Sequence, residues 1–298
     1  MLGLALIDEC LKNNTHIVAL IRNNSTKSGL LPKSKFITTI SCDISELKCI
    51  KPDIAHGFDV FYHFAWNCPT KADRNNIVMQ SQNINYTLDA LKLAHQLGSN
   101  RFIGAGSQAE FGRVSGIITP DMIASPENAY GIAKYASGML SSLLAKQLGI
   151  DFIWPRIFSV YGAHNSFSTM IMYCIQSLLK GIRPSFTPCE QKWDYLHCSD
   201  AAKAMYLLGK YGKSHESYNI GSGITRPLSE FIYIIRDAID PNSSLGIGDN
   251  PYSPNEVMNL NPDITNLKND TGFEPSISFE EGIINTINWC KDVENEDY

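Results

Sequence analysis

Apolar residues in the first two-thirds of the chain alternate between short runs and longer stretches with helical spacing. The short runs are rich in β-branched and aromatic residues, which is typical of strands; they lie at 16–21, 35–42, 59–64, 101–105 and 151–157. The longer stretches repeat apolar residues three and four positions apart and predict helices at 4–11, 80–96 and 128–147. This alternation predicts a parallel sheet with helices on both faces.

Beyond residue 162 the pattern is less regular. Helices are expected at 167–179, 199–209, 228–240 and 279–291, and short strands at 193–197 and 218–221. No repeat, low-complexity tract or linker separates the two parts. We therefore expect a first domain over 1–163, to which 193–221 return, and an interleaved second lobe over 164–298.

Composition narrows the class of protein. The chain has 298 residues, of which 44% are hydrophobic and 18% charged, with a net charge of −5. Without a basic stripe it is not expected to bind nucleic acid. No apolar run approaches the roughly 20 residues of a membrane span, and the first 13 residues do not have the pattern of a secretory signal. Eight cysteines without paired spacing predict reduced thiols in the cytoplasm and no metal site.

Tyr130 and Lys134 lie four residues apart and are expected on one face of a helix. An ammonium beside a phenol favours the phenolate and lowers the tyrosine pKa, so the pair could move a proton to or from a sugar oxygen. Such a pair also occurs by chance on helix surfaces. Ser107, which follows an expected strand, could hold the reacting oxygen beside Tyr130, although a serine there is more often a turn residue.

Several further segments have the order and spacing of known landmarks, and together with Ser107, Tyr130 and Lys134 they resemble the extended short-chain dehydrogenases/reductases of the NAD(P)-dependent epimerase/dehydratase type. These segments are Asp43-Ile44, His63-Phe64-Ala65-Trp66, Asn83-Ile84-Asn85-Tyr86-Thr87, Ser107-Gln108-Ala109-Glu110-Phe111-Gly112, Arg156-Ile157-Phe158-Ser159-Val160-Tyr161-Gly162, Tyr218-Asn219-Ile220-Gly221 and Thr271-Gly272-Phe273-Glu274-Pro275. The resemblance implies a Rossmann-type doubly wound parallel sheet, a smaller α+β substrate lobe and a homodimer formed by the two long helices, 83–96 and 128–147.

The resemblance also implies roles for individual residues. Ser107, Tyr130 and Lys134 would be catalytic, and Tyr130 and Lys134 would also contact the cofactor. The other residues expected to bind the cofactor are Gly3, Arg22, Asp43, Ile44, Phe64, Ala65, Trp66, Asn83 and Ile157. Those expected to bind a nucleotide-sugar substrate are Gln108, Ser159, Lys192 and Trp193.

The start of the chain departs from the family pattern. A dinucleotide fold opens with a strand and a glycine-rich turn whose amides hold the pyrophosphate. This sequence begins Met1-Leu2-Gly3-Leu4, already within an expected helix. Gly3 could be the last glycine of such a turn, and the first strand, in the middle of the sheet, is expected to be missing.

Three other positions bear on cofactor and reaction. Arg22 follows a strand where an acidic residue would bind the ribose of NAD, so NADP(H) is favoured over NAD(H). Gln108 and Ala109 stand where related 4,6-dehydratases carry Asp-Glu, which favours 4-keto reduction or C4 epimerisation of a nucleotide-linked deoxysugar. Glu190-Gln191 and the stretch 243–258 most resemble the deoxysugar 4-reductases of surface-polysaccharide pathways.

Ser159 stands where the family segment R-x-F-N-V-Y-G has an asparagine, and two further departures lie in the substrate lobe. Trp193 and Ser253 occupy places where the family has phosphate-binding arginines. The alternative to an enzyme is a catalytically impaired nucleotide-binding or sensor protein, because the phosphate-binding turn is missing.

Overall fold

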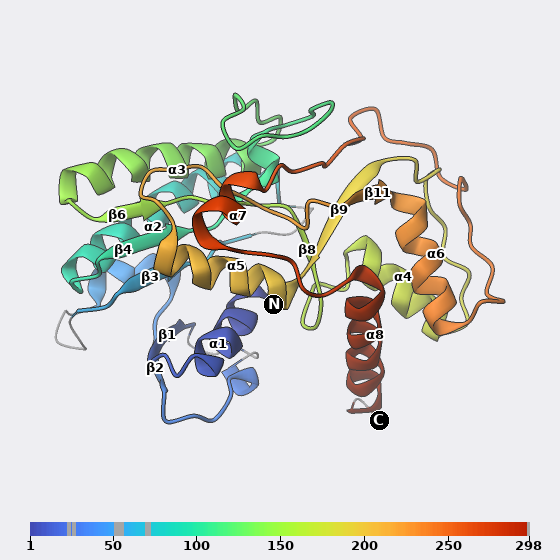
Figure 1. Ribbon diagram of the computed structural model, residues 1–298, viewed down its shortest axis with the longest axis horizontal. Helices are drawn as coiled ribbons and strands as arrows, with labels where there is room; N and C mark the ends of the chain where they lie inside the picture. Colours follow the sequence, from blue (N-terminus) through green and yellow to red (C-terminus); the bar gives the residue numbers. More distant parts are fainter. Residues whose placement is uncertain (23–24, 26–27, 51–56, 69–72, 297–298) are drawn as a thin grey trace.

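The computed structural model describes residues 1–22, 25, 28–50, 57–68 and 73–296 (Figure 1). Its helices are α1 (Leu2–Lys12), α2 (Ile77–Gln96), α3 (Ala129–Leu148), α4 (Met170–Leu179), α5 (Cys198–Tyr211), α6 (Leu228–Ile239), α7 (Thr265–Thr271) and α8 (Phe279–Glu296), with short 3-10 turns η1 (Ser28–Leu30), η2 (Ile44–Cys49) and η4 (Gln108–Glu110). Its strands are β1 (Ile17–Ile21), β2 (Ile37–Ser41), β3 (Val60–His63), β4 (Arg101–Gly104), β5 (Gly106–Ser107), β6 (Asp151–Ile153), β7 (Arg156–Ile157), β8 (Ser159–Tyr161), β9 (Lys192–His197), β10 (Asn219–Ile220) and β11 (Thr225–Pro227). Among the described helices, none is long and apolar enough to span a bilayer.

The strands of the first part pair in parallel, as the alternating pattern predicts. The order β3-β4-β6 continues into β5-β7-β10 in one register, since Arg101 lies opposite Asp151 and Gly106 opposite Arg156. β4 and β5 are thus one strand interrupted at Ala105. The run 151–157, which the sequence predicts as one strand, is likewise broken where Pro155 lacks a backbone N–H.

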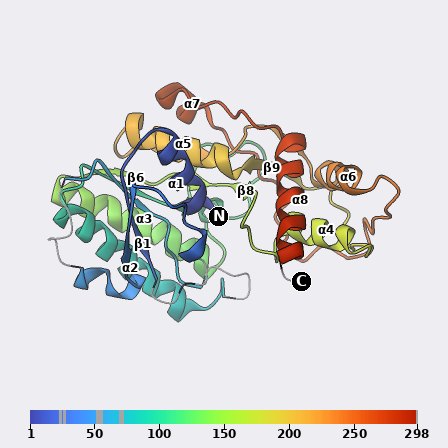
Figure 2. The ribbon, with the colours of Figure 1, turned by 90° about the horizontal axis from the view of Figure 1, so that it is seen from below.

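Side-chain alternation along these strands builds three layers, as Figure 2 shows. Phe102 and Phe152 pack with the helices α2 and α3 on one face. Their chain neighbours Ile103 and Ile153 pack on the other face against α1 and α5. Because successive residues of a strand point to opposite faces, apolar neighbours on one strand require helices on both sides.

β1 pairs in parallel with β2 and stands apart from the rest of the sheet. Within the described residues, no strand joins β1 to β3. This division coincides with the place where the family pattern has its first strand. Gly3 lies in the first turn of α1, where an added Cβ would meet no atom within 4 Å. Its role in a phosphate-binding turn stays a prediction.

The later part packs α4, α6 and α8 around Tyr195 of β9 in a second apolar cluster, on the right in Figure 1. Strands β8, β9 and β11 form a mixed parallel and antiparallel sheet that connects the two parts. The sequence did not predict α7, β8 or β11, because three to seven residues are too few to show a period. The helix expected at 128–147 lies within one residue of α3: Asn128 caps it and accepts a hydrogen bond from the Gly131 N–H at 2.8 Å.

Candidate active site

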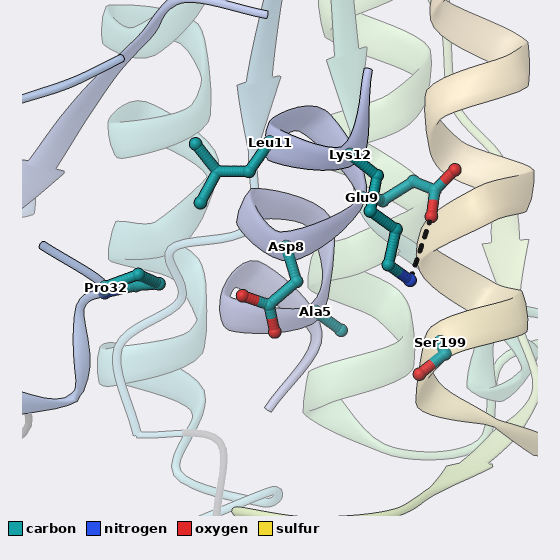
Figure 3. Close-up of a pocket in the computed structure, with 7 residues that line it drawn as sticks. All are labelled: Ala5, Asp8, Glu9, Leu11, Lys12, Pro32 and Ser199. Atoms are coloured by element: carbon teal, nitrogen blue, oxygen red, sulfur yellow. Dashed lines mark ion pairs between the residues drawn. The ribbon is translucent and has the colours of Figure 1, made fainter. Parts of the chain in front are cut away.

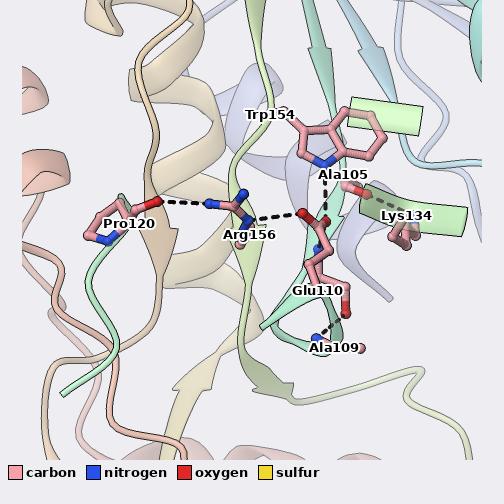
Figure 4. Close-up of polar contacts among 8 residues, drawn as sticks. Ala105, Ala109, Glu110, Pro120, Lys134, Trp154 and Arg156 are labelled. Atoms are coloured by element: carbon pink, nitrogen blue, oxygen red, sulfur yellow. Dashed lines mark hydrogen bonds and ion pairs between the residues drawn. The ribbon is translucent and has the colours of Figure 1, made fainter. Parts of the chain in front are cut away.

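Ser107 and Lys134 meet at the interruption between β4 and β5. The buried Lys134 Nζ donates a hydrogen bond to the Ala105 carbonyl oxygen at 2.7 Å, which Figure 4 shows. Ser107 is also buried and begins η4, where its Oγ accepts from the Ala109 N–H. The predicted lysine is therefore hydrogen-bonded to the chain two residues before the predicted serine.

Tyr130 lies in the first turn of α3, next to η4. A Cβ at Gly131 would lie 2.4 Å from the Ala109 carbonyl oxygen, so only glycine lets the turn that carries Ser107 approach the helix so closely. The Tyr130 N–H donates to the Arg74 carbonyl at 2.9 Å. The structure thus brings the three predicted catalytic residues together, and their catalytic role remains a prediction.

Burial dominates the proton equilibria of this site. Desolvation lowers the pKa of Lys134 to about 7, while the charge of Glu110 acts in the opposite direction. Burial also raises the pKa of Tyr130; the Ser107 side chain and the Arg74 charge lower it by less. The direction for Tyr130 is opposite to the one the sequence analysis predicted, because burial of the ring outweighs neighbouring positive charge.

The segment after β3 forms one wall of the site. The indole of Trp66 lies over Lys134, with Nζ 3.6 Å from the ring centroid, and meets the Tyr130 ring edge to face. Gln80 accepts from Trp66 Nε1 at 2.9 Å, and Asn83 accepts from the Asn67 N–H while donating to its carbonyl. Asn83 therefore holds this segment in place with its own polar atoms, a positioning task that the predicted cofactor contact did not include.

His63, Phe64 and Ala65 complete that wall. Burial, helped by the Lys134 charge, lowers the pKa of His63 to about 3, so this imidazole is uncharged at neutral pH. Phe64 is half-buried against Tyr62, and Ala65 is exposed. Their cofactor contacts stay predictions.

The residues expected to bind the adenosine half of the cofactor lie at the ends of β1 and β2. Asp43 caps η2 by accepting from the Ser45 N–H at 2.9 Å and from its hydroxyl at 2.7 Å. These two bonds lower the pKa of Asp43, and the charge of the exposed Arg22 adds to the effect. Arg22 and Asp43 thus share one end of the sheet, next to Ile44.

Trp193 and Ser159, which both differ from the family pattern, are hydrogen-bonded to each other. Trp193 Nε1 donates to Ser159 Oγ at 2.8 Å, so the residue in the place of the arginine is paired with the residue in the place of the asparagine. Ile157, two residues before Ser159, packs in the first domain's apolar cluster. Lys192 is exposed and Gln108 half-buried, and both stay predicted substrate contacts.

Two surface hollows lie outside this set of residues. One, of about 370 Å³, is lined by Asp8, Glu9 and Lys12 of α1 with Pro32 and Ser199 (Figure 3), and its two carboxylates do not suit a phosphate. The other, of about 540 Å³, contains Ser253, and Arg113 is its basic lining residue. Ser253 donates to Glu256 at 2.7 Å, so this position supplies no cation for a phosphate.

Glu110 was not among the predicted site residues, although it has the least exposed charged side chain beside the site. Its carboxylate is fully buried and ion-paired with Arg156, whose Nε lies 2.9 Å away. A signal was present: Ser107 and Glu110 have the S-x-x-E spacing of a capping box, and the structure forms that box.

The donor groups present suit the nicotinamide riboside half of a dinucleotide. Lys134 offers one ammonium with three N–H groups, of which the Ala105 carbonyl takes one, and Tyr130 offers a hydroxyl beside it. The fit is therefore to the reactive half of the cofactor.

Known proteins resemble this chain along most of its length. It is 24% identical to a dTDP-glucose 4,6-dehydratase of Streptomyces niveus over 80% of this chain and 72% of that protein. It is also 24% identical to a putative UDP-glucose 4-epimerase of Methanocaldococcus jannaschii, over 97% and 95%.

Solved structures share the fold. A UDP-glucose 4-epimerase of Thermotoga maritima with UDP-glucose superposes with a TM-score of 0.86 at 20% identity, over 99% of this chain and 96% of that one. A UDP-glucuronic acid 4-epimerase of Bacillus cereus with UDP-glucuronic acid and NAD gives 0.85 at 20%, over 98% and 96%. These likenesses confirm the Rossmann-type architecture.

The family itself is shown by a family model that matches residues 1–221. That span includes every motif that carried the resemblance except the last, Thr271 to Pro275. The chain belongs to the NAD dependent epimerase/dehydratase family.

Proposed function

We propose that this protein acts at C4 of a nucleotide-linked deoxysugar, as a 4-ketoreductase or a C4 epimerase of the cytoplasm. The observation that carries the proposal is that Ser107 and Lys134 both lie close to Tyr130: the Ser107 side chain lowers the pKa of Tyr130, and Lys134 Nζ lies 5.8 Å from its ring centroid. A protein that only binds a nucleotide has no need for a proton-transfer set of this kind.

The proton chemistry follows from the burial of Tyr130. Its raised pKa keeps the phenol protonated at neutral pH, which suits donation of a proton to the oxygen of a 4-keto sugar. The Ser107 hydroxyl would hold that oxygen, and Lys134 would bind the ribose hydroxyls and orient the tyrosine. A bound nicotinamide supplies or accepts the hydride at C4.

Water elimination is not proposed, although dTDP-glucose 4,6-dehydratases are among the relatives. Gln108 and Ala109 occupy the positions of the dehydratase acid and base. Glu110, the next carboxylate along the chain, is fully buried and bonded to Arg156 and Trp154, so it has no free face toward a substrate. Reduction or epimerisation therefore remains, and we favour reduction in a surface-polysaccharide pathway.

We further propose that the Trp193–Ser159 pair forms part of the sugar-nucleotide site, together with Gln108 and Lys192. An indole hydrogen-bonded to Ser159 offers a flat apolar face in place of a guanidinium. The substrate phosphates would then rest on fewer charged donors than in the family pattern, with Lys192 as the nearest exposed cation in sequence. NADP(H) remains the favoured cofactor because Arg22 is exposed at the ribose end of β1.

The test measures turnover of a panel of nucleotide-linked 4-keto-6-deoxysugars by the purified protein. The decrease in NADPH or NADH absorbance reports the rate. UDP- and dTDP-hexoses with NAD would test epimerisation in parallel. Tyr130→Phe should lower kcat about 10²- to 10⁴-fold and leave cofactor affinity nearly unchanged. Equal loss of turnover and affinity would contradict the proposed proton transfer.

The second candidate is a catalytically impaired nucleotide-binding or sensor protein. It is favoured by one observation: Trp193, hydrogen-bonded to Ser159, stands where the family pattern has a phosphate-binding arginine. Titration of intrinsic fluorescence with NADPH separates the two candidates, because Trp66 lies against Lys134 and should respond to occupancy. Binding without turnover on every sugar of the panel would favour the sensor, and binding with turnover would exclude it.

We also propose that the protein forms a homodimer through α2 and α3. These helices pack side by side over the sheet, and their outer faces expose the large apolar side chains of Ile77, Val78, Ile132, Met139 and Leu143. Exposed apolar surface on two adjacent helices is typical of a four-helix subunit interface.

A further inference from the structure

We propose that Glu110 is a positioning residue that fixes the turn carrying Ser107 and, with Arg156, sets the electrostatic field in which Tyr130 and Lys134 exchange protons. The proposal rests on the proposed function for the roles of Ser107, Tyr130 and Lys134. It assigns a task to a charged pair that the expected catalytic set does not include.

The first step is the geometry of the carboxylate. Glu110 Oε1 accepts from the Ser107 N–H at 2.8 Å and from Trp154 Nε1 at 3.0 Å, and Oε2 accepts from Arg156 Nε at 2.9 Å. Figure 4 shows the carboxylate between the indole and the guanidinium. Three donors from two segments of the chain fix this group in one orientation, and the Ser107 backbone with it.

The second step is the link from the pair to the loop beside the site. Arg156 Nη1 donates to the Pro120 carbonyl at 2.8 Å, and its guanidinium lies 4.7 Å from the Phe111 ring centroid. The side chain of Arg156 is 13% exposed, whereas that of Glu110 is fully buried. A carboxylate without access to water stays ionised only with such partners, so removing either charge alters the local field strongly.

The charge of Glu110 acts on the two titratable groups of the site, Lys134 and Tyr130. Glu110 favours the protonated form of Lys134 and opposes ionisation of Tyr130, and so raises the pKa of both. From the other sides, Arg74 faces the Tyr130 ring, with its guanidinium carbon 5.1 Å from the centroid, and the neutral His63 faces Lys134. Among these groups Glu110 is the anion.

The sign of each expected effect follows. Glu110→Gln removes the negative charge and should move the titration of Lys134 and Tyr130 to lower pH. Arg156→Gln leaves the carboxylate uncompensated and should move both to higher pH. A shift on the order of one pH unit is expected for a charge this close in partly screened surroundings. Structural damage alone would not give opposite signs.

The primary experiment measures Lys134 without any substrate. Because its ammonium lies over Trp66, deprotonation should change the indole emission, and the pH midpoint of that change reports the lysine. Trp66→Phe and Lys134→Met must each abolish the signal in the wild-type background. The midpoint should fall in Glu110→Gln and rise in Arg156→Gln; identical midpoints would overturn the proposal even in a protein that shows no turnover.

Two conservative variants separate charge from position. Glu110→Asp keeps the charge on a shorter side chain, so its midpoint should stay near wild type while kcat falls about tenfold or more, because Ser107 is displaced. Unchanged kcat in an enzyme that is otherwise active would remove the positioning role. If Glu110→Gln does not fold, Arg156→Gln and Arg156→Lys decide. A midpoint that is higher in Arg156→Gln but not in Arg156→Lys supports the role of the charge, and equal midpoints in the two variants refute it.

Discussion

Lys134, a proposed catalytic residue, occupies a position that lowers the stability of the folded protein. Its side chain is 5% exposed, and burial lowers its pKa from 10.5 to about 7 in the folded protein. Below about pH 7 the folded state must hold a buried ammonium. Between about pH 7 and 10.5 only the unfolded chain binds this proton, so this contribution to the free energy of unfolding rises with pH across that window.

Lys134→Met should therefore raise the thermal unfolding midpoint below about pH 7, with a gain that shrinks as the pH approaches 10.5. Thermal unfolding over a pH series measures it. Lys146→Met, at an exposed position of the same helix, is the control and should show no such pH dependence. A gain in Lys134→Met that is equal at all pH values would contradict the assignment of the shift to this lysine.

Arg22 gives a second test at the scale of one side chain. Arg22→Ala should raise KM for NADPH about tenfold and leave KM for NADH almost unchanged, because only NADPH carries the 2′-phosphate. Steady-state kinetics or cofactor titration measures the ratio. Lys48→Ala, at an exposed position on η2, should leave the ratio unaltered. A parallel loss for both cofactors would assign Arg22 to general binding.

Single residues also show the reach of sequence reasoning. The i,i+4 spacing placed Tyr130 and Lys134 on one helix face, but only the ordered family landmarks around them predicted a catalytic set with Ser107. The direction of the Tyr130 pKa was out of reach, because it depends on how deeply the ring is buried. Glu110 is an intermediate case, since its capping-box spacing is visible in the sequence but its ion pair with Arg156 is not.

At the scale of elements, the N-terminus of α3 matters more than its length. Asn128 caps the helix two residues before Tyr130, so a frayed first turn would displace the phenol. Asn128→Ala should lower the free energy of unfolding by about 1 kcal/mol and also lower kcat. Ser278→Ala removes the bond that Ser278 Oγ accepts from the Glu281 N–H on α8, and should lower stability similarly without altering kcat. If kcat were equal in Asn128→Ala and Ser278→Ala, the Asn128 cap would have no specific effect on catalysis.

Periodicity predicted the long elements well and the short ones poorly. Helices α2, α3 and α5 and strands β1 to β4 lie within a few residues of their expected bounds. Their faces are buried along many residues, which makes the pattern readable. The break between β6 and β7 depends on Pro155, and α7 is too short for a period to appear.

At the scale of the whole molecule, the apolar faces of α2 and α3 predict a dimer. Leu143→Asp places a charge on a side chain that is 58% exposed in the single chain, and should shift the mass measured by light scattering from two chains toward one. Ile284→Asp, at a 52% exposed position on α8, should leave the mass unchanged. A wild-type protein that is monomeric at all concentrations would refute the interface.

The alternation of strands and helices was sufficient to predict a parallel sheet covered on both faces. It could not give the pairing of β7 with β10, which depends on contacts between residues far apart in sequence. Nor could it show that Trp193 and Ser159 are hydrogen-bonded, because they lie far apart in sequence and only the structure shows that their side chains are in contact.

The interruption at Ala105 has a consequence for how a cofactor would be bound. Its N–H still pairs with the His63 carbonyl, whereas its own carbonyl accepts from Lys134. A free lysine side chain has about 2 kcal/mol of rotamer entropy to lose. Here that entropy is lost when the sheet folds, so a ribose hydroxyl of a bound cofactor would meet an amino group that is already ordered.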